Sequence, residues 1–251
     1  MLDGMPARAA TYNIVAGRAT SRSFTLSAVE AQREAMFDLT LSFDNGPEPG
    51  VTPTVLDTLA RADIKSTFFV LGKKLADPAR RKLAERAFAE GHWIGNHTYT
   101  HSVPFGINPD PQACEKEIAR TQSLVAELAH PDRLFRPFGG GGNLNRQLLS
   151  RDAVDFLVDG RYSCVLWNSV PRDWEDVDGW MDTALEQCAA QAWTLMVLHD
   201  LPTGAMRHLE RFIERSREAG GRFRQDFPPQ CVPIRRGEIV LPLQDYVAPP
   251  P

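Results

Sequence analysis

The stretch Phe37-Asp-Leu-Thr-Leu-Ser-Phe-Asp-Asn-Gly-Pro47 joins a strand pattern to an abrupt stop. Apolar residues alternate along its first seven positions, which is typical of a β-strand, and Gly46-Pro47 ends the pattern. The acid Asp44 and the amide Asn45 are therefore left at the carboxyl end of a strand, where α/β enzymes hold their catalytic groups. By itself, Asp-Asn-Gly-Pro is also a run of turn formers, so its interpretation depends on later stretches of the chain.

Length and composition indicate a globular protein. The 251 residues suffice for one α/β domain with a buried core, and 43% hydrophobic and 24% charged residues are ordinary values. The net charge of −4 offers no attraction for nucleic acid or an anionic membrane. No apolar run approaches the ~20 residues of a membrane span, and the first residues lack the apolar core of a secretory signal. We therefore expect a cytoplasmic protein without nucleic-acid or membrane partners, and the composition says nothing of its oligomeric state.

The four cysteines, at positions 114, 164, 188 and 231, are far apart and form no C-x-x-C pair. This spacing favours free, mostly buried thiols over a disulfide framework or a cysteine metal site.

Strand and helix patterns alternate about six times between residues 36 and 226. After the first strand, apolar runs predict strands at 66–71, 92–96, 133–136, 163–167 and 194–198. Helical patterns lie at 52–62, with Thr52 as its N-cap, and at 78–90, 111–128, 144–158, 179–190 and 205–219. Residues 1–35 are an N-terminal extension with short strand patterns at 10–15 and 21–26. The proline-rich residues 227–251 are expected to be an extended, partly disordered tail.

This alternation predicts parallel strands joined by helical crossovers. A closed barrel and an open doubly wound sheet both fit the order of elements. No G-x-G-x-x-G follows a strand, so the main signature of a dinucleotide-binding fold is missing. Polar residues after several strands favour a barrel, because barrels draw catalytic groups from many strand ends. We predict a distorted (β/α) barrel of about seven parallel strands with surrounding helices.

Two histidines four residues apart, His97 and His101, follow the predicted strand at 92–96. On a helical turn this spacing puts both imidazoles on one side, where they could hold a metal ion. Such pairs are also common by chance. Arg136, at the end of another strand, is either a surface residue or a guanidinium that holds a catalytic carboxylate by paired hydrogen bonds.

Two further polar pairs follow later strands. Asp173-Trp174 comes after the strand at 163–167 and could be no more than a packed loop. His199-Asp200 ends the most apolar strand, where a titratable pair favours a catalytic role over packing. Metal-dependent phosphohydrolases also use a His-Asp doublet, but those proteins are all-helical, and this doublet ends a strand.

Five stretches between residues 37 and 200 together resemble the polysaccharide deacetylases, that is, the NodB homology domain of carbohydrate esterase family 4. They resemble the family motifs T-F-D-D-G-P, H-S/T-x-x-H, R-x-P-Y/F-G, D-x-x-D-W and L-x-H-D, in the family's order. The stretches are Ser42–Pro47, His97–His101, Phe135–Gly139, Trp167–Trp174 and Leu198–Asp200. As a set they are highly specific, and the resemblance implies hydrolysis of an acetyl amide or ester on a sugar.

The resemblance also implies catalytic roles. Asp44 would be the general base that deprotonates a water, held in place by Arg136. His199 would protonate the leaving amine as the general acid, and Asp173 would orient it and keep it protonated.

A divalent metal is implied as well, with Zn²⁺ expected and Co²⁺ or Ni²⁺ as alternatives, to polarise the acetyl carbonyl. Its ligands would be His97, His101 and Asn45. A backbone N–H near Tyr99 or His101 would help to stabilise the oxyanion. The residues expected at the substrate are Trp174, Leu198, Tyr99 and Pro137.

Three positions depart from the family pattern. Asn45 stands where the family has a metal-binding aspartate, Val170 replaces the first aspartate of D-x-x-D-W, and Phe138 replaces a proline. A neutral amide should bind an ion less tightly than a carboxylate. These changes point to a divergent subgroup whose substrate need not be a glycan.

Two other functions stay open. The first is an amidohydrolase of a small cytosolic amide or ureide on the same barrel, acting without metal, which Asn45 and the missing secretory signal favour. The second is an inactive glycan-binding protein on a degraded barrel. The presence of Asp44, Arg136, Asp173 and His199 argues against it, because a binding protein needs neither a base nor an acid.

Overall fold

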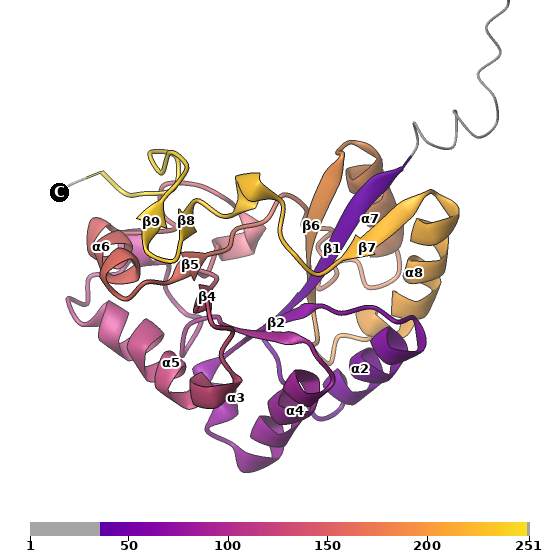
Figure 1. Cartoon of the computed structure of the whole chain (residues 1–251), viewed down its shortest axis with the longest axis horizontal. Helices are drawn as coiled ribbons and strands as arrows, with labels where there is room; N and C mark the ends of the chain where they lie inside the picture. The colour runs from indigo at the N-terminus through magenta and orange to yellow at the C-terminus, as the bar shows by residue number, and fades with distance from the viewer. Residues whose placement is uncertain (1–35, 250–251) are drawn as a thin grey trace, which may run out of the picture.

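The computed structural model describes residues 36–249, in which a curled sheet carries helices along its outer side (Figure 1). The short strands expected at 10–15 and 21–26 lie outside the described residues. The strands are β1 (Phe37–Asp44), β2 (Thr67–Val70), β3 (Trp93–Asn96), β4 (Leu134–Phe135), β5 (Ser163–Cys164), β6 (Trp193–His199), β7 (Gly221–Arg224), β8 (Ile234–Arg235) and β9 (Glu238–Ile239).

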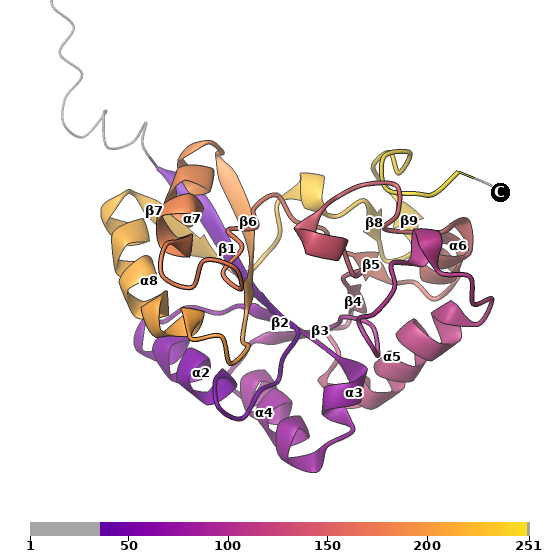
Figure 2. The same cartoon turned by 180° about the vertical axis from the view of Figure 1, so that it is seen from behind.

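Strand β1 is the centre of the sheet. It pairs with β6 along almost its whole length, and on its other edge with β7 at its start and β2 at its end. The order then continues through β3, β4 and β5, and β1 to β7 all run parallel. The sheet curls rather than closing fully, and a bridge between Ser169 and Met196 draws the segment after β5 towards β6 (Figure 2). The predicted barrel of parallel strands is therefore confirmed in its curled form.

The pleat of β1 separates two kinds of surroundings. Leu39, Leu41 and Phe43 are fully buried in the main apolar core, which the outer helices complete. The residues between them are polar and point to the inside of the barrel, where the Ser42 hydroxyl donates a 2.8 Å hydrogen bond to the carbonyl of Met196. This alternation, which the sequence predicts, brings Asp44 to the inner, carboxyl end of the strand.

The helices follow the predicted order with shifted boundaries. They are α2 (Thr52–Arg61), α3 (Gly72–Leu75), α4 (Pro78–Ala89), α5 (Arg120–Val125), α6 (Arg151–Asp159), α7 (Trp180–Ala189) and α8 (Leu209–Glu218). The helix expected from 144 begins only at Arg151, because Ser150 caps it by accepting a hydrogen bond from the N–H of Ala153. Val51, not Thr52, is the N-cap residue of α2, and the Thr52 hydroxyl instead donates to the Asp200 carboxylate. The segment 111–128 is helical as predicted but irregular, because a π-helical turn, Cys114–Ala119, runs directly into α5 and a 3-10 turn, Ala126–Leu128, follows it.

The segment 227–249 is not the extended, partly disordered tail that its prolines suggested. Cys231, Val232 and Ile234 are buried, and the hairpin of β8 and β9 adds to the sheet beside β5. Further along, Tyr246 and Val247 pack against a second apolar cluster, which includes Ala153, Val154 and Leu157 of α6. Scattered apolar residues between the prolines therefore dock this segment on the barrel.

All four cysteines are free, as predicted, and three of them are buried. Burial raises the pKa of Cys164 to about 12, which keeps this thiol protonated at neutral pH. Within residues 36–249, no helix combines the length and the apolar character needed to cross a bilayer.

Candidate active site

Five strands each bring one candidate side chain to the carboxyl end of the barrel. Asp44 ends β1, His97 follows β3, Arg136 follows β4, Asp173 lies in the loop after β5, and His199 ends β6. Asp44 and His199 are register partners on neighbouring strands, and both line the same cavity. The polar residues that the sequence places after separate strands therefore meet at one end of the barrel.

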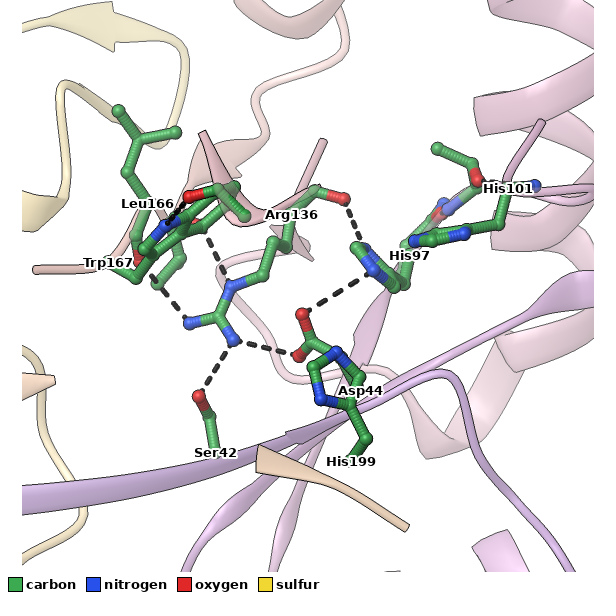
Figure 3. A network of polar contacts seen from close by, with 12 residues as sticks. Ser42, Asp44, His97, His101, Arg136, Leu166, Trp167 and His199 are labelled. Carbon is green, nitrogen blue, oxygen red and sulfur yellow. Dashed lines mark hydrogen bonds and ion pairs between the residues drawn. The ribbon is translucent and has the colours of Figure 1, made fainter. Parts of the chain in front are cut away.

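Arg136 and Asp44 form a buried ion pair. Nη1 of the guanidinium, which is wholly buried, donates to Oδ1 of Asp44 at 2.8 Å and to the Ser42 hydroxyl at 2.7 Å (Figure 3). The other guanidinium nitrogens donate to the main-chain carbonyls of Val165 and Leu166, both at 3.2 Å. Arg136 therefore holds the carboxylate through one hydrogen bond rather than the expected pair, and its remaining donors tie the end of β1 to the segment after β5.

His199 is held by Asp173 through two contacts. Nδ1 of the imidazole lies 2.8 Å from Oδ1 of Asp173, and the main-chain N–H of His199 donates to Oδ2 at 3.0 Å. Burial alone would lower the pKa of His199, but the hydrogen bond and charge of Asp173, together with the charges of Asp44 and Asp200, outweigh it and the pKa is raised. Trp174 packs edge-on against the imidazole, with ring centroids 4.8 Å apart. His199 is thus oriented and favoured in its protonated form.

His97 has the geometry of a metal ligand. Its Nδ1 lies 2.8 Å from the main-chain carbonyl of Arg136, which can only accept, so Nδ1 carries the proton and Nε2 presents a lone pair. Burial lowers the pKa of His97 and keeps the ring neutral. Nε2 lies 3.4 Å from Oδ2 of Asp44, and two electron-rich atoms this close suit a cation between them or beside them.

Two further ligand groups face the same space. The His101 ring is 4.8 Å from that of His97, and burial, with the neighbouring His97, lowers the pKa of His101 to about 2. Oδ1 of Asn45 is buried without a hydrogen-bond partner in the described residues. Within residues 36–249 no three histidine, cysteine, aspartate or glutamate side chains are placed to hold an ion together. A three-ligand site here therefore depends on the Asn45 amide, and the donor set of two imidazoles and one oxygen fits a divalent ion such as Zn²⁺.

The cavity at this end of the barrel measures about 280 Å³. Its polar side chains are those of the candidate catalytic and ligand residues, and the remaining side chains that line it are apolar. The apolar lining consists of Phe138, Trp167, Val170, Trp174, Val197 and Leu201, together with three glycines of the loop 139–142. The loop lies so close that a Cβ on Gly139 would approach the Trp167 ring to 2.7 Å.

Three residues expected at the substrate do not reach the cavity. Leu198 points outward into the main core, because its neighbours in the pleat, Val197 and His199, point inward. The Tyr99 ring lies beneath the guanidinium of Arg120, at 3.7 Å. Pro137 is buried but does not line the cavity, although Phe138 does. Trp174 is the one residue of the expected substrate set that lines it.

The turn from His97 to His101, called the histidine turn below, does not leave the N–H of Tyr99 or His101 free to stabilise an oxyanion. The N–H of Tyr99 donates to the Glu117 carboxylate at 2.8 Å, and the N–H of His101 donates to the Thr98 hydroxyl at 3.1 Å. Both N–H groups therefore already have acceptors, one in Glu117 and one within the turn itself.

Sequence reasoning missed Ser42, which accepts a hydrogen bond from Arg136, and the inward position of Val197. Strand alternation was a usable signal for both, because Ser42 and Asp44 are two apart, as are Val197 and His199. No local signal pointed to Glu117, whose role appears only when its helical turn packs beside the histidines.

The fold and site define a hydrolase built on a curled α/β barrel, with a carboxylate and an imidazole facing one cavity. Residues 33–153 match the sequence profile of polysaccharide deacetylase. The chitooligosaccharide deacetylase of Rhizobium leguminosarum bv. trifolii is 36% identical over 162 residues, which cover 64% of this chain and 70% of that protein.

Solved structures agree with this fold. A peptidoglycan N-acetylglucosamine deacetylase superposes with a TM-score of 0.62 at 26% identity, covering 79% of this chain and 89% of that one. A family 4 acetyl xylan esterase from Clostridium thermocellum, solved with a cobalt ion, gives a TM-score of 0.62 at 24% identity, covering 75% and 87% of the two chains. The chain belongs to the polysaccharide deacetylase family, and it is a hydrolase of carbon–nitrogen bonds other than peptide bonds.

Proposed function

We propose that this protein removes the acetyl group from an N-acetylated amino sugar, in a free oligosaccharide or a polymer, by metal-assisted hydrolysis. The observation that carries the proposal is that Asp44 and His199 face one cavity while each is held by a buried partner of opposite charge. A base and an acid are thereby available on the two sides of one acetyl amide. The similarity to a chitooligosaccharide deacetylase supports the choice of substrate.

Asp44 suits the role of the base. Arg136 engages Oδ1, so that Oδ2 is left on the side of His97 and the cavity. A carboxylate held in this way accepts a proton from a water as the water attacks the acetyl carbon. Because Arg136 is anchored by four acceptors, including Asp44 itself, the carboxylate does not need to reorganise during the step.

His199 suits the role of the acid. Its Nδ1–H is directed at Asp173, so the proton on Nε2 is the one that can pass to the leaving amine. The raised pKa of His199 favours the protonated form that carries this proton. Asp173 then stabilises the imidazolium before the transfer and fixes the tautomer after it.

His97, His101 and Asn45 are the residues that would hold the divalent ion, for which we favour Zn²⁺. Such an ion would supply Lewis-acid polarisation of the acetyl carbonyl. The apolar side chains opposite, among them Trp167 and Trp174, suit the acetyl methyl group and the apolar face of a sugar ring.

A second candidate function is hydrolysis of a small amide or ureide without a metal. The neutral amide of Asn45 at a ligand position favours it, as does a cavity whose side chains offer few polar groups beyond the catalytic ones. The same base and acid would serve that reaction, so the two candidates differ in substrate and in dependence on the ion.

The test measures acetate release from N-acetylchitooligosaccharides by the unchanged protein and by Asp44→Asn and His199→Gln. Each substitution should lower kcat by about 10²–10⁴-fold. Asp226→Asn and His208→Gln alter exposed or peripheral side chains away from the cavity and should leave the rate unchanged. A chelator should abolish acetate release, and added Zn²⁺ or Co²⁺ should restore it.

Turnover of small amides that survives the chelator would support the second candidate instead. Full activity in both catalytic variants would refute the assigned roles. No turnover of any acetylated substrate or amide, together with measurable glycan binding, would indicate the inactive binding protein.

A further inference from the structure

The turn that carries the two histidines has an unfavourable backbone conformation. Thr98 has φ 66° and His101 has φ 56°, both in the left-handed region, which non-glycine residues seldom adopt. For a β-branched residue such as Thr98 this conformation is a genuine outlier. Such a backbone persists only when the surrounding structure imposes it.

One side of the turn is held by the start of α3. The N–H of Gly72 donates to the carbonyl of Thr98 at 3.0 Å, and the N–H of Lys73 donates to the carbonyl of Tyr99 at 3.1 Å. This approach requires glycine at 72, because a Cβ there would lie 2.3 Å from the Thr121 hydroxyl oxygen and 2.5 Å from the Tyr99 ring. The carbonyls of the turn are thus satisfied from this side.

The other side of the turn is held by Glu117. Its Oε2 accepts hydrogen bonds from the successive N–H groups of Tyr99 and Thr100, both at 2.8 Å, and its Oε1 accepts from the Thr100 hydroxyl at 2.7 Å. Two successive N–H groups that converge on one anion resemble the backbone nests that bind free anions. Bonds to a carboxylate are about twice as strong as neutral ones.

The π-helical turn Cys114–Ala119 explains how Glu117 reaches this position. Besides the Glu117 side chain, this turn presents the carbonyl of Ile118, which accepts from the Asn96 side chain at 2.9 Å. The Asn96 amide oxygen in turn accepts from the N–H of Thr98 at 3.0 Å. Adjacent residues of one irregular helical turn therefore support the same loop, and π-helical turns often occur at functional sites.

We propose that Glu117 is a positioning residue that holds the turn between His97 and His101 in the conformation that lets both imidazoles bind one ion. Glu117 does not line the cavity and acts only through the backbone of Tyr99 and Thr100. The inference rests on the proposed metal-assisted function, since it concerns the affinity of the same site for the ion.

The experiment compares Glu117→Ala, Glu117→Gln and the control Glu115→Ala, which removes an exposed carboxylate from the same helical turn. Co²⁺ affinity is measured by calorimetry, and ligand geometry by the visible absorption of the Co²⁺-loaded proteins. Glu117→Ala should bind Co²⁺ about 10- to 100-fold more weakly, as substitutions of groups that orient metal ligands do. Glu117→Gln should lie between, because the amide oxygen can still accept from the two N–H groups. Glu115→Ala should match the unchanged protein.

A second measurement follows hydrogen exchange of the Tyr99 and Thr100 amides, which should be faster in Glu117→Ala and unaffected in Glu115→Ala. Equal Co²⁺ affinity in Glu117→Ala and Glu115→Ala would overturn the inference alone. If Glu117→Ala fails to fold, an unchanged affinity in folded Glu117→Gln with faster amide exchange would overturn it as well. No Co²⁺ binding by the unchanged protein would overturn the proposed function, and the inference with it.

Discussion

Replacing Arg136 with methionine should destabilise the protein strongly, because it leaves a buried carboxylate without its counter-charge. Arg136 is 0% exposed and Asp44 is 3% exposed, so solvent screens the charges of the pair very little. The guanidinium also packs over the Phe69 ring at 4.0 Å, and methionine keeps part of that contact while removing the charge and the donors. The substitution therefore isolates the polar role of the side chain.

The expected size of the effect follows from these contacts. Breaking a buried ion pair by removing one partner typically costs about 3–5 kcal/mol of unfolding free energy. Two main-chain carbonyls and the Ser42 hydroxyl lose donors as well, which places Arg136→Met towards the upper end of that range. Combining it with Asp44→Asn should cost less than the sum of the single changes, with a coupling of about 2–3 kcal/mol.

Urea unfolding followed by tryptophan fluorescence measures these free energies for the two single variants and the double variant. Arg172→Met is the matched control, because Arg172 is an exposed arginine paired with Glu175, and its loss should cost under about 1 kcal/mol. A cost below about 1 kcal/mol for Arg136→Met, or additive effects within about 0.5 kcal/mol, would refute the view that the pair is a buried, mutually dependent unit.

Three other predictions concern single acids and the Asn45 amide. Asp173→Asn removes the charge that raises the pKa of His199, so the alkaline limb of the pH–rate profile should move to lower pH; a limb that stays in place would show that Asp173 does not set it. Asn45→Asp should restore an anionic ligand and tighten Zn²⁺ or Co²⁺ binding by roughly tenfold or more in calorimetry, whereas equal affinity would mean that Asn45 does not contact the ion. Burial raises the pKa of Asp200 to about 7, well above its usual 3.8, so its stabilising contribution is complete below pH ~4 and is lost as the pH rises towards 7. In chelator-treated protein, Asp200→Asn should remove this pH dependence, which amounts to at most about 4 kcal/mol of unfolding free energy. Urea unfolding at several pH values measures it. If the unfolding free energy of Asp200→Asn changes with pH as much as that of the unchanged protein, Asp200 is not its source.

Much of the candidate active site was predictable because most of its residues stand at or just after the ends of strands. Strand alternation and the stop at Gly46-Pro47 are local features, so Asp44 and His199 could be placed at carboxyl ends before any fold was known. Parallel strands bring such ends together, and the order of the motifs then defined the family. For the same reason, the sequence already indicated a distorted barrel of parallel strands with helices outside it.

The tertiary structure decided which side chains face the cavity. In β6 the run Leu195–Leu198 is apolar on both faces, so the apolar pattern alone does not tell which face of the strand lies inside the barrel. Pairing with β1, in which Asp44 meets His199, places His199 inside the barrel, and alternation then puts Val197 inside and Leu198 outside.

Contacts between distant segments were beyond local patterns as well. The bond between Arg136 and Asp44 joins residues 92 apart, and Glu117 reaches the histidine turn from an irregular helical turn that the periodicity of 111–128 concealed. A hydrogen bond of this kind depends on where the chain returns after several crossovers, which is a property of the tertiary fold. Sequence therefore determined which groups are available for the chemistry, and packing determined which of them meet and what holds them there.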